Sequence, residues 1–503
     1  MVKRVSLTLY LAALAVLASA QGLVVGVFDG GFDYTHPAFR DSEGRLCISR
    51  VWEQGTEGVH PDGYDYGLEL TTAEAILQAG ADNDTQSHGT HVAARALQFA
   101  GRQEGTEMVL VAKTSTKLDE ARLRDAIRYI FDYAESVGKP CVINLSIGNH
   151  LGPHDGTSGF DRFINETVGP GHIIVGSAGN SGSSTCHLST DAEPIRSFII
   201  YRSPDYTQGT IDIWGSQGMQ FGVQLSAVQY QNGNVSSQSE TVVVGSEAES
   251  RTYTWAPSTG RLKGTFTFES EVSPLNGCPH VTIGINQTSA AMNYDLALSV
   301  TPLTEGTVHA WSDDIYSSFH NRDREDFCMG DNLFTVSELG GTADGIISVG
   351  AMDANGNVAS FSSVGPRLDG SVKPNVYAYG ADIESALNSF DQYQSSYAYT
   401  QTIELDGRTY HYGKMSGTSM AAPMVTGIVG SWLRLNPGMT PGEAMALMEP
   451  GQLIDAEKGL TDGLPAVPGM ASHPEVYYDL TGRPVRPVRP ALYLVGGRKV
   501  WVE

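Results

Sequence analysis

Three short apolar runs, each followed by a polar or glycine-rich loop, constrain the fold of this chain more than any other feature. They lie at 24–28, 142–147 and 173–177, and their short length and mostly apolar content, interrupted in the second run by Asn144 and Ser146, are typical of buried strands. Between the first two lies a segment with apolar residues at helical spacing, namely Leu123, Ile127, Ile130, Ala134 and Val137. Strands that alternate with helices predict an α/β fold, in which helices cover both faces of a mostly parallel sheet.

Polar residues follow two of these runs closely. Asp29 and two glycines end the first run, and Asn180 lies in the small-residue loop after the third. Because the functional loops of a parallel sheet gather at the carboxyl ends of its strands, we expect both side chains at that edge. Taken alone, Asp29 would be interpreted as a turn or helix cap.

A second signal is the sequence Ser-Gly-Thr-Ser-Met-Ala-Ala-Pro at 416–423, which places Ser419 at the start of a predicted helix. Pro423 is expected in the first turn of that helix, where a missing N–H costs nothing. The free N–H groups and the partial positive charge of a helix N-terminus would stabilise an anion that forms beside the serine.

The sequence Ser-His-Gly-Thr-His at 87–91 supplies a base for Ser419. His88 would take the proton of the hydroxyl and return it to the leaving amine, while Asp29 orients the imidazole. Asn180 would donate to the tetrahedral oxyanion together with the backbone N–H of Ser419. His91 lies on the same helix face as His88, and we expect it to pack rather than to bind a metal ion.

Taken together, in the order Asp, His, Asn, Ser, these motifs resemble those of the subtilisin-like serine peptidases, the subtilase family. The segments 347–351 and 359–366 strengthen the resemblance. The segments 50–54 and 66–67 resemble the clostridial germination-protease and Bacteroides-type branch. The resemblance implies a three-layer subtilase fold and a secreted serine endopeptidase that acts through an acyl-enzyme.

The resemblance also assigns a substrate-binding surface. Five residues would pair with the substrate backbone and wall the specificity pocket, namely Ser146, Ile147, Gly148, Ala178 and Gly179. No cofactor is required for this chemistry, and structural calcium is expected from the family alone. Asn144, on the same predicted strand as Ser146, is interpreted as a buried hydrogen-bonding residue.

Two alternatives from other functional classes stay open. One is a catalytically impaired member of the family that binds peptides or surface partners without cutting them. The other is a carbohydrate- or surface-binding protein, which would need exposed aromatic residues, and the candidates are Trp214, Trp255 and Trp311.

The region 187–315 differs from its flanks, because short β-branched or aromatic segments alternate there with Gly, Asn, Pro and Ser. This pattern predicts an inserted all-β sandwich, which the resemblance identifies as jelly-roll-like. The catalytic domain would comprise 21–186 and 316–460. A linker at 461–474 and a β-hairpin tail at 475–503, similar to the sorting tails of exported Bacteroidetes proteins, complete the expected organisation.

The net charge and the N-terminal residues limit which partners the protein can bind and where in the cell it is expected. The net charge of −24 argues against nucleic-acid binding, which needs a basic face. Residues 1–20 combine a basic start, an apolar run and an Ala-x-Ala end, the pattern of a signal peptide, and no other stretch could span a membrane. We therefore expect a monomer that acts on proteins or peptides. It would be secreted, extracellular, at the cell surface or in the periplasm of a Gram-negative, Bacteroidetes-like cell.

The chain has five cysteines, and an odd number leaves at least one thiol unpaired. Cys141 borders a predicted buried strand and is expected to be free. Cys186 and Cys328 flank the inserted region and are candidates for a disulfide.

Overall fold

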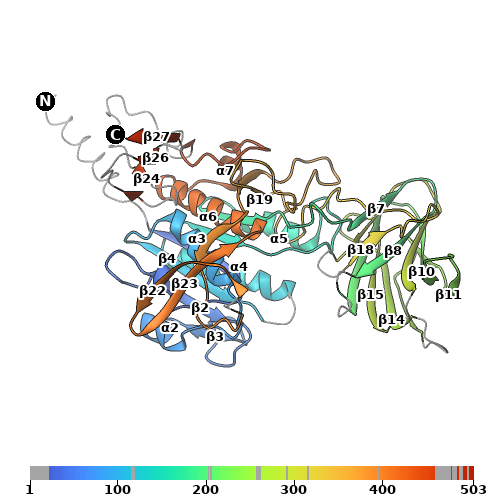
Figure 1. Cartoon of the computed structure of the whole chain (residues 1–503), viewed down its shortest axis with the longest axis horizontal. Coiled ribbons are helices and arrows are strands. Elements are labelled where there is room, and N and C mark those ends of the chain that lie inside the picture. Colours follow the sequence, from blue (N-terminus) through green and yellow to red (C-terminus); the bar gives the residue numbers. More distant parts are fainter. Residues whose placement is uncertain are drawn as a thin grey trace.

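The computed structural model describes residues 22–114, 119–201, 203, 207–255, 262–289, 293–313, 317–393 and 396–458, together with four short strands nearer the C-terminus. Figure 1 shows two bodies side by side, an α/β body and a β-sandwich. The expected signal peptide at 1–20 and the expected linker at 461–474 lie outside the described residues.

The α/β body is built on an eight-stranded sheet in the order β20-β19-β6-β5-β1-β4-β2-β3. All neighbouring strands are parallel except β2 and β3. The strands are β1 (Leu23–Asp29), β2 (Ile48–Glu53), β3 (Leu68–Leu70), β4 (Thr106–Ala112), β5 (Cys141–Leu145), β6 (His172–Ser177), β19 (Ile346–Met352) and β20 (Val376–Tyr379). The predicted α/β fold with a mostly parallel sheet is confirmed. The chain moves to opposite sides of β1, so the carboxyl end of β1 is the expected place for a site.

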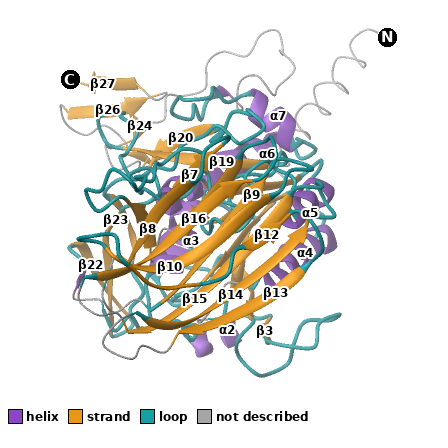
Figure 2. Ribbon diagram, turned by 90° about the vertical axis from the view of Figure 1, so that its right-hand side faces the viewer, coloured by secondary structure: helices purple, strands orange, loops and turns teal. Residues whose placement is uncertain are grey.

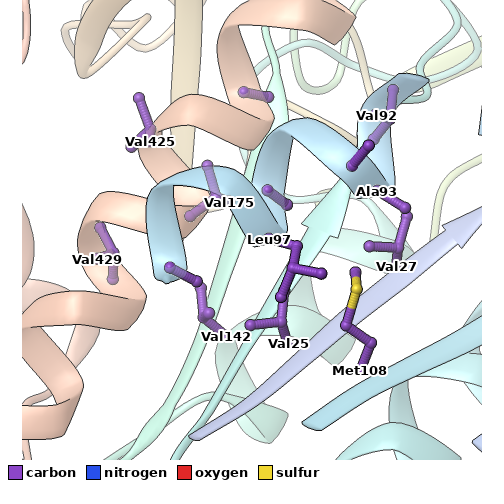
Figure 3. Close-up of a cluster of buried hydrophobic side chains, with 14 of the residues drawn as sticks. Val25, Val27, Val92, Ala93, Leu97, Met108, Val142, Val175, Val425 and Val429 are labelled. Carbon is purple, nitrogen blue, oxygen red and sulfur yellow. The ribbon is translucent and has the colours of Figure 1, made fainter. Parts of the chain in front are cut away.

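Helices cover both faces of this sheet. One face carries α3 (His88–Ala100), α6 (Thr418–Leu435) and α7 (Pro441–Ala446), and the other carries α4 (Glu120–Ser136) and α5 (Gly159–Thr167). Successive side chains of a strand point to opposite faces. Val25 and Val27 of β1 therefore join the core under α3 and α6, whereas Val24 and Phe28 join the core under α4. Figure 3 shows the first of these cores, with valines of the sheet beneath α3 and α6.

The helix pattern read from the sequence is confirmed for α4, with one difference. Leu123, Ile127, Ile130 and Ala134 are buried, but Val137 is exposed because the helix ends at Ser136.

Helices α3 and α6 cross at very short range. A Cβ placed on Gly427 of α6 would lie 2.4 Å from Cβ of Phe99 and 2.5 Å from the carbonyl oxygen of Ala96. Only glycine allows this approach, and it brings the helix that begins at His88 against the helix that bears Ser419.

The sandwich consists of two antiparallel sheets that follow β6 in the chain, and Figure 2 shows its strands in front of the α/β body. One sheet contains β8 (Ile195–Tyr201), β10 (Phe221–Gln229), β11 (Val235–Gln238), β12 (Val242–Val244), β16 (Tyr294–Pro302) and β18 (Ser317–His320). The other contains β7 (His187–Thr190), β9 (Gln208–Gly215), β13 (Glu249–Trp255), β14 (Lys263–Val272), β15 (Pro279–Ser289) and β17 (Val308–Ser312). The predicted inserted sandwich is confirmed, and its last strand lies beyond residue 315.

Smaller elements surround the main sheet. A three-stranded antiparallel sheet precedes α6 and contains β21 (Ile383–Ala386), β22 (Tyr399–Leu405) and β23 (Arg408–Met415). The helix α2 (Ala73–Ala79) and the 3-10 helix η1 (Pro37–Phe39) lie between strands of the first third of the chain. Near the C-terminus, β24 (Tyr477–Tyr478), β25 (Pro484–Val485), β26 (Ala491–Val495) and β27 (Arg498–Val502) form an antiparallel sheet. Among the described helices, none combines the length and the apolarity needed to cross a bilayer.

The candidate disulfide does not form. All five cysteines are free thiols, and Cys186 is buried whereas Cys328 is exposed. Cys141 is free, as predicted, and its burial raises the pKa of its thiol.

Two of the three candidate aromatic residues for carbohydrate binding pack inside the protein. Trp311 is fully buried and its ring stacks on His154, with 4.2 Å between the ring centroids. Trp214 is also buried and stacks on His280 at 3.9 Å. Trp255 is partly buried and lies beside Phe266 of the sandwich core. These three residues therefore form no exposed platform.

Candidate active site

Asp29 and His88 meet at the carboxyl end of β1. Asp29 is the last residue of β1 and is almost fully buried, whereas His88 is the first residue of α3. Nδ1 of His88 lies 2.9 Å from each carboxylate oxygen of Asp29. A carboxylate can only accept, so Nδ1 carries the proton and donates it. Nε2 is then the basic nitrogen of the neutral ring.

The two glycines after the acid let its loop touch the helix of the base. The carbonyl oxygens of Gly30 and Gly31 accept hydrogen bonds from the backbone N–H groups of Gly89 (2.8 Å) and Thr90 (3.1 Å). These are N–H groups of the first turn of α3, which have no partner inside the helix. A Cβ on Gly31, whose φ is +85°, would lie 2.2 Å from the carbonyl oxygen of Gln86. Both the positive φ and the close approach require glycine here.

Charges around His88 set its pKa. Burial lowers this pKa, but the charge and the hydrogen bond of Asp29 outweigh burial and leave the pKa of His88 above its ordinary value. Lys113 lowers the pKa of His88 and Asp84 raises it, and these two side chains form an ion pair with 3.6 Å between Nζ and Oδ2.

Ser419 lies in the first turn of α6, which begins at Thr418. The prediction that Pro423 also lies in the first turn is wrong, because Pro423 is inside the helix. An interior proline lacks the N–H that would bond to the carbonyl four residues earlier, which here is the carbonyl of Ser419. That carbonyl oxygen instead accepts a hydrogen bond from the hydroxyl of Ser146 at 2.9 Å. The proline therefore frees a group that ties Ser419 to the end of β5.

A buried polar chain continues from Ser146 into α6. Nδ2 of Asn144 donates to the hydroxyl oxygen of Ser146 at 2.9 Å, and Oδ1 of Asn144 accepts from the hydroxyl of Thr426 at 3.0 Å. Asn144 is thus a buried hydrogen-bonding residue, as predicted. These hydrogen bonds fix α6 against the end of β5 at Ser419 and again at Thr426.

The hydroxyl of Ser419 donates to the carbonyl oxygen of Ser146 over a long 3.4 Å. Within the described residues it makes no hydrogen bond to His88. Catalytic hydrogen bonds are often long or poorly aligned without substrate. Asp29, Ser146 and Asn180 end or follow the three adjacent strands β1, β5 and β6, so the structure holds all the candidate catalytic groups at one edge of the sheet.

Asn180 is oriented by the residue before Ser419. Its Oδ1 accepts hydrogen bonds from the backbone N–H (2.9 Å) and the hydroxyl (3.1 Å) of Thr418. The hydroxyl of Thr418 in turn accepts from the N–H of Gly179 at 3.1 Å. These bonds fix which end of the amide is the oxygen, and they leave Nδ2 of the exposed Asn180 as a donor close to the residues that begin α6.

The two segments expected to wall the specificity pocket directly follow adjacent strands of the sheet. Residues 146–148 follow β5, and residues 178–179 follow β6. Both contact Ser337. A Cβ on Gly148 would lie 2.3 Å from Oγ of Ser337, and a Cβ on Gly179 would lie 3.2 Å from Cβ of Ser337. Two glycines therefore let these segments close on a buried serine that the sequence did not single out.

His91 packs into the core, as predicted. Its Nε2 lies 2.9 Å from the carbonyl oxygen of Ile383, and burial lowers the pKa of His91 to about 3. In the part of the chain that the structure describes, no group of three or more His, Cys, Asp or Glu side chains is arranged to hold a metal ion. The expectation of structural calcium therefore rests on the resemblance alone.

Sequence reasoning missed Thr418, Ser337 and the partner of Ser87. Thr418 could have been found from its position directly before Ser419. The partner of Ser87 is Asp391, which lies 304 positions further along the chain. No spacing rule connects residues so far apart.

Comparison with known proteins agrees with this geometry. The model of the subtilase family matches residues 20–255 and 321–450, which is well over half of the chain. The chain belongs to the subtilase family.

Individual relatives match this subtilase over shorter stretches. It is 37% identical to the serine protease AprX of Bacillus subtilis over 119 residues, which cover 22% of the subtilase and 25% of AprX. It is 32% identical to an uncharacterized protein of Aquifex aeolicus over 138 residues, which cover 25% of the subtilase and 57% of that relative. The subtilase thus spans about a quarter to just over half of the length of these relatives.

The solved structure of the CspB protease of Clostridium perfringens shares the fold of the subtilase. The TM-score is 0.65 at 20% sequence identity, and the match covers 85% of the subtilase and 88% of CspB.

Proposed function

We propose that this subtilase is a secreted serine endopeptidase. Ser419 would be the nucleophile, His88 the general base and acid, and Asp29 the group that orients His88. Asn180 and the backbone N–H of Ser419 would donate to the oxyanion. The observation that carries the proposal is the Asp29–His88 pair, because it leaves Nε2 of His88 basic at the sheet edge where Ser419 lies.

In the first half of the reaction, Oγ of Ser419 forms a bond to the carbonyl carbon of the scissile peptide while Nε2 of His88 takes the hydroxyl proton. The negative charge on the carbonyl oxygen is met by Nδ2 of Asn180 and the N–H of Ser419. The C–N bond then breaks, and His88 gives its proton to the leaving amine. Water repeats these steps on the acyl-enzyme, which releases the acid and restores Ser419.

Residues 146–148 and 178–179 would hold the substrate backbone beside the nucleophile. We further propose a monomer that works outside the cytoplasm, at the cell surface or in the periplasm. The pattern of a signal peptide at 1–20 supports this location. The fold shared with CspB supports a place in the clostridial germination-protease and Bacteroides-type branch.

Covalent labelling tests the proposal. The purified full chain should react with a fluorophosphonate probe, peptide mapping should place the probe on Ser419, and the protein should cleave casein. Ser419→Ala should lose labelling and at least about 10³-fold in activity while it keeps the melting temperature of the parent. A parent chain that binds peptides but neither reacts with the probe nor cleaves would instead support the impaired alternative.

A further inference from the structure

The hydroxyl of Ser87 does not cap the helix that it precedes. A serine at this position normally accepts a hydrogen bond from an N–H group of the first helical turn, but Ser87 makes no such bond with α3. The N–H groups of Gly89 and Thr90 are bonded to the carbonyl oxygens of Gly30 and Gly31 instead. The side chain of Ser87 is fully buried, and its hydroxyl is available for another partner.

That partner is Asp391, in the segment between β21 and β22. Oγ of Ser87 donates to Oδ2 of Asp391 at 2.6 Å and accepts from the N–H of Asn388 at 3.1 Å. The short distance is typical of a charge-assisted hydrogen bond. Asp391 is buried, and its Oδ1 accepts from the N–H of Tyr393 at 2.7 Å. Nδ2 of Asn388 also donates to the carbonyl oxygen of Gln86 at 3.0 Å.

The same segment holds the loop that follows Asp29. Oδ2 of Asp33, which is fully buried, accepts from the N–H (3.0 Å) and the hydroxyl (2.5 Å) of Ser389. The N–H of Asp33 donates to the hydroxyl of Thr90 in α3 at 2.8 Å. The segment 388–391 therefore bonds both to the loop of the acid and to the residue before the base.

We propose that the segment 388–391 positions the Asp29–His88 pair, and that it acts on His88 mainly through the Ser87–Asp391 hydrogen bond. Ser87 directly precedes His88, so a shift of the Ser87 backbone moves the imidazole relative to both Asp29 and Ser419. Ser87 and Asp391 are positioning residues, because neither takes part in a bond-making or proton-transfer step. The inference rests on the proposed role of His88 in catalysis.

A positioning role predicts a specific kinetic signature. Small displacements of a catalytic group can reduce the rate by up to about 100-fold without weakening substrate binding. Ser87→Ala and Asp391→Ala should therefore each lower kcat by about 10- to 100-fold, counted per active site titrated with the fluorophosphonate, and leave KM nearly unchanged. The double variant should be no slower than the slower single variant, because both remove the same hydrogen bond.

Conservative variants and a matched control separate positioning from a general loss of stability. Ser87→Thr keeps the hydroxyl and Asp391→Asn keeps an acceptor oxygen, so both should recover most of kcat. The control is Asp353→Ala, which removes a turn carboxylate that accepts two backbone N–H groups, from Asn355 and Asn357, both at 2.9 Å. Asp353 contacts none of the candidate catalytic residues, so this variant should keep the parental kcat.

The outcomes are distinct. A parental kcat per titrated site in Ser87→Ala and Asp391→Ala, with only the melting temperature lowered, would overturn the inference and leave the proposed function intact. Additive losses in the double variant would overturn it as well. If Asp391→Ala does not fold, the kcat per titrated site of Ser87→Ala, which removes one hydroxyl, is sufficient to test the inference. A parent chain that does not react with the probe would overturn the proposed function, and this inference with it.

Discussion

The carbonyl oxygen of Gly30 accepts a hydrogen bond from the backbone N–H of Gly89 at 2.8 Å. The residue directly after the acid is thus bonded to the residue directly after the base. Asp29 ends a buried strand and His88 begins a buried helix, so the relative position of the two side chains is set by the backbone. A site built on such rigid elements needs little rearrangement before it acts.

The contact between these two segments makes the second glycine after the acid critical. Gly31→Ala should lower the free energy of unfolding by about 3 kcal/mol or more. Its φ of +85° costs a residue with a side chain about 1–2 kcal/mol, and the new Cβ would also overlap the carbonyl oxygen of Gln86. Urea unfolding measures this loss of free energy. The value of kcat should also fall, because the loop after Asp29 and the start of α3 must move apart to make room for the new Cβ.

Gly44→Ala is the matched control for this variant. Gly44 has a φ of +80°, but a Cβ there would meet no atom within 4 Å. Gly44→Ala should therefore lower the free energy of unfolding only by the backbone cost of about 1–2 kcal/mol. If both variants lost the same free energy of unfolding, the loop after Asp29 would be able to rearrange around the added methyl group without further cost.

The oriented amide of Asn180 predicts a selective effect on the rate. Asn180→Ala should lower kcat by about 10²–10³-fold, the loss known for one oxyanion donor of a subtilisin, and should change KM little. The reason is that the donor meets a charge that exists only in the transition state. Steady-state kinetics on a peptide substrate measure both constants, and a raised KM with unchanged kcat would place Asn180 in substrate binding instead.

Thr418→Val tests whether the orientation of that amide matters. The variant keeps the backbone N–H that bonds to Oδ1 of Asn180 but removes the hydroxyl that bonds to both Asn180 and Gly179. We expect kcat to fall by less than in Asn180→Ala. In the Asn180→Ala background the same change should have almost no further effect on kcat, because the group that it orients is gone.

Much of the site could be predicted from sequence because each motif is local. Asp29, His88 and Ser419 each lie at the end of a strand or the start of a helix, Asn180 lies in the loop directly after a strand, and the parallel sheet brings these positions to one edge. Contacts across the chain could not be predicted in the same way. Asp391 and Ser87 are brought together by the packing of β21 against α3, which positions the segment that follows β21.

The misplacement of Pro423 has a related cause. The sequence shows that the proline follows a turn, but the first residue of the helix is set by tertiary contacts. The hydroxyl of Ser146 satisfies the carbonyl that Pro423 leaves free, so the helix can begin earlier than the proline alone suggests. The rule that proline favours the first turn was outweighed by one side chain from the residue that follows β5.

The pH dependence of activity should follow the pKa of His88. Because Asp29 holds this pKa above the ordinary value of about 6.5, kcat/KM should rise with pH through a midpoint above 6.5 as the imidazole loses its proton. Lys113→Gln removes a positive charge that lowers the pKa of His88, so its midpoint should move to higher pH. The shift should grow at low ionic strength.

Lys458→Gln is the control for this profile, since Lys458 is bonded to Glu449 and does not act on His88. Its profile should match that of the parent. A midpoint that moves to lower pH in Lys113→Gln would contradict the assigned electrostatics, and a rate independent of pH would remove His88 from the role of base.

The stability of the fold should fall in acid through His309, a partly buried histidine of the sandwich. Nδ1 of His309 on β17 lies 3.0 Å from Nε2 of His187, whose Nδ1 lies 2.7 Å from Oδ1 of Asp331. Burial and the neighbouring His187 lower the pKa of His309 to about 4, against the opposing effect of Asp331. In the unfolded chain the pKa is about 6.5.

The sign follows from these two values. The unfolded chain binds the proton more readily, so the stabilisation is complete above pH 6.5 and is lost as the pH falls from 6.5 toward 4, by about 2 kcal/mol at pH 5. Urea unfolding at pH 7 and pH 5 measures it. In His309→Gln the free energy of unfolding should differ between pH 7 and pH 5 by about 2 kcal/mol less than in the parent. His60→Gln, at an exposed position, should show the same difference as the parent. If His309→Gln kept the parental difference in the free energy of unfolding, the folded protein would protonate His309 as easily as the unfolded chain does. Burial and His187 would then not lower the pKa of His309.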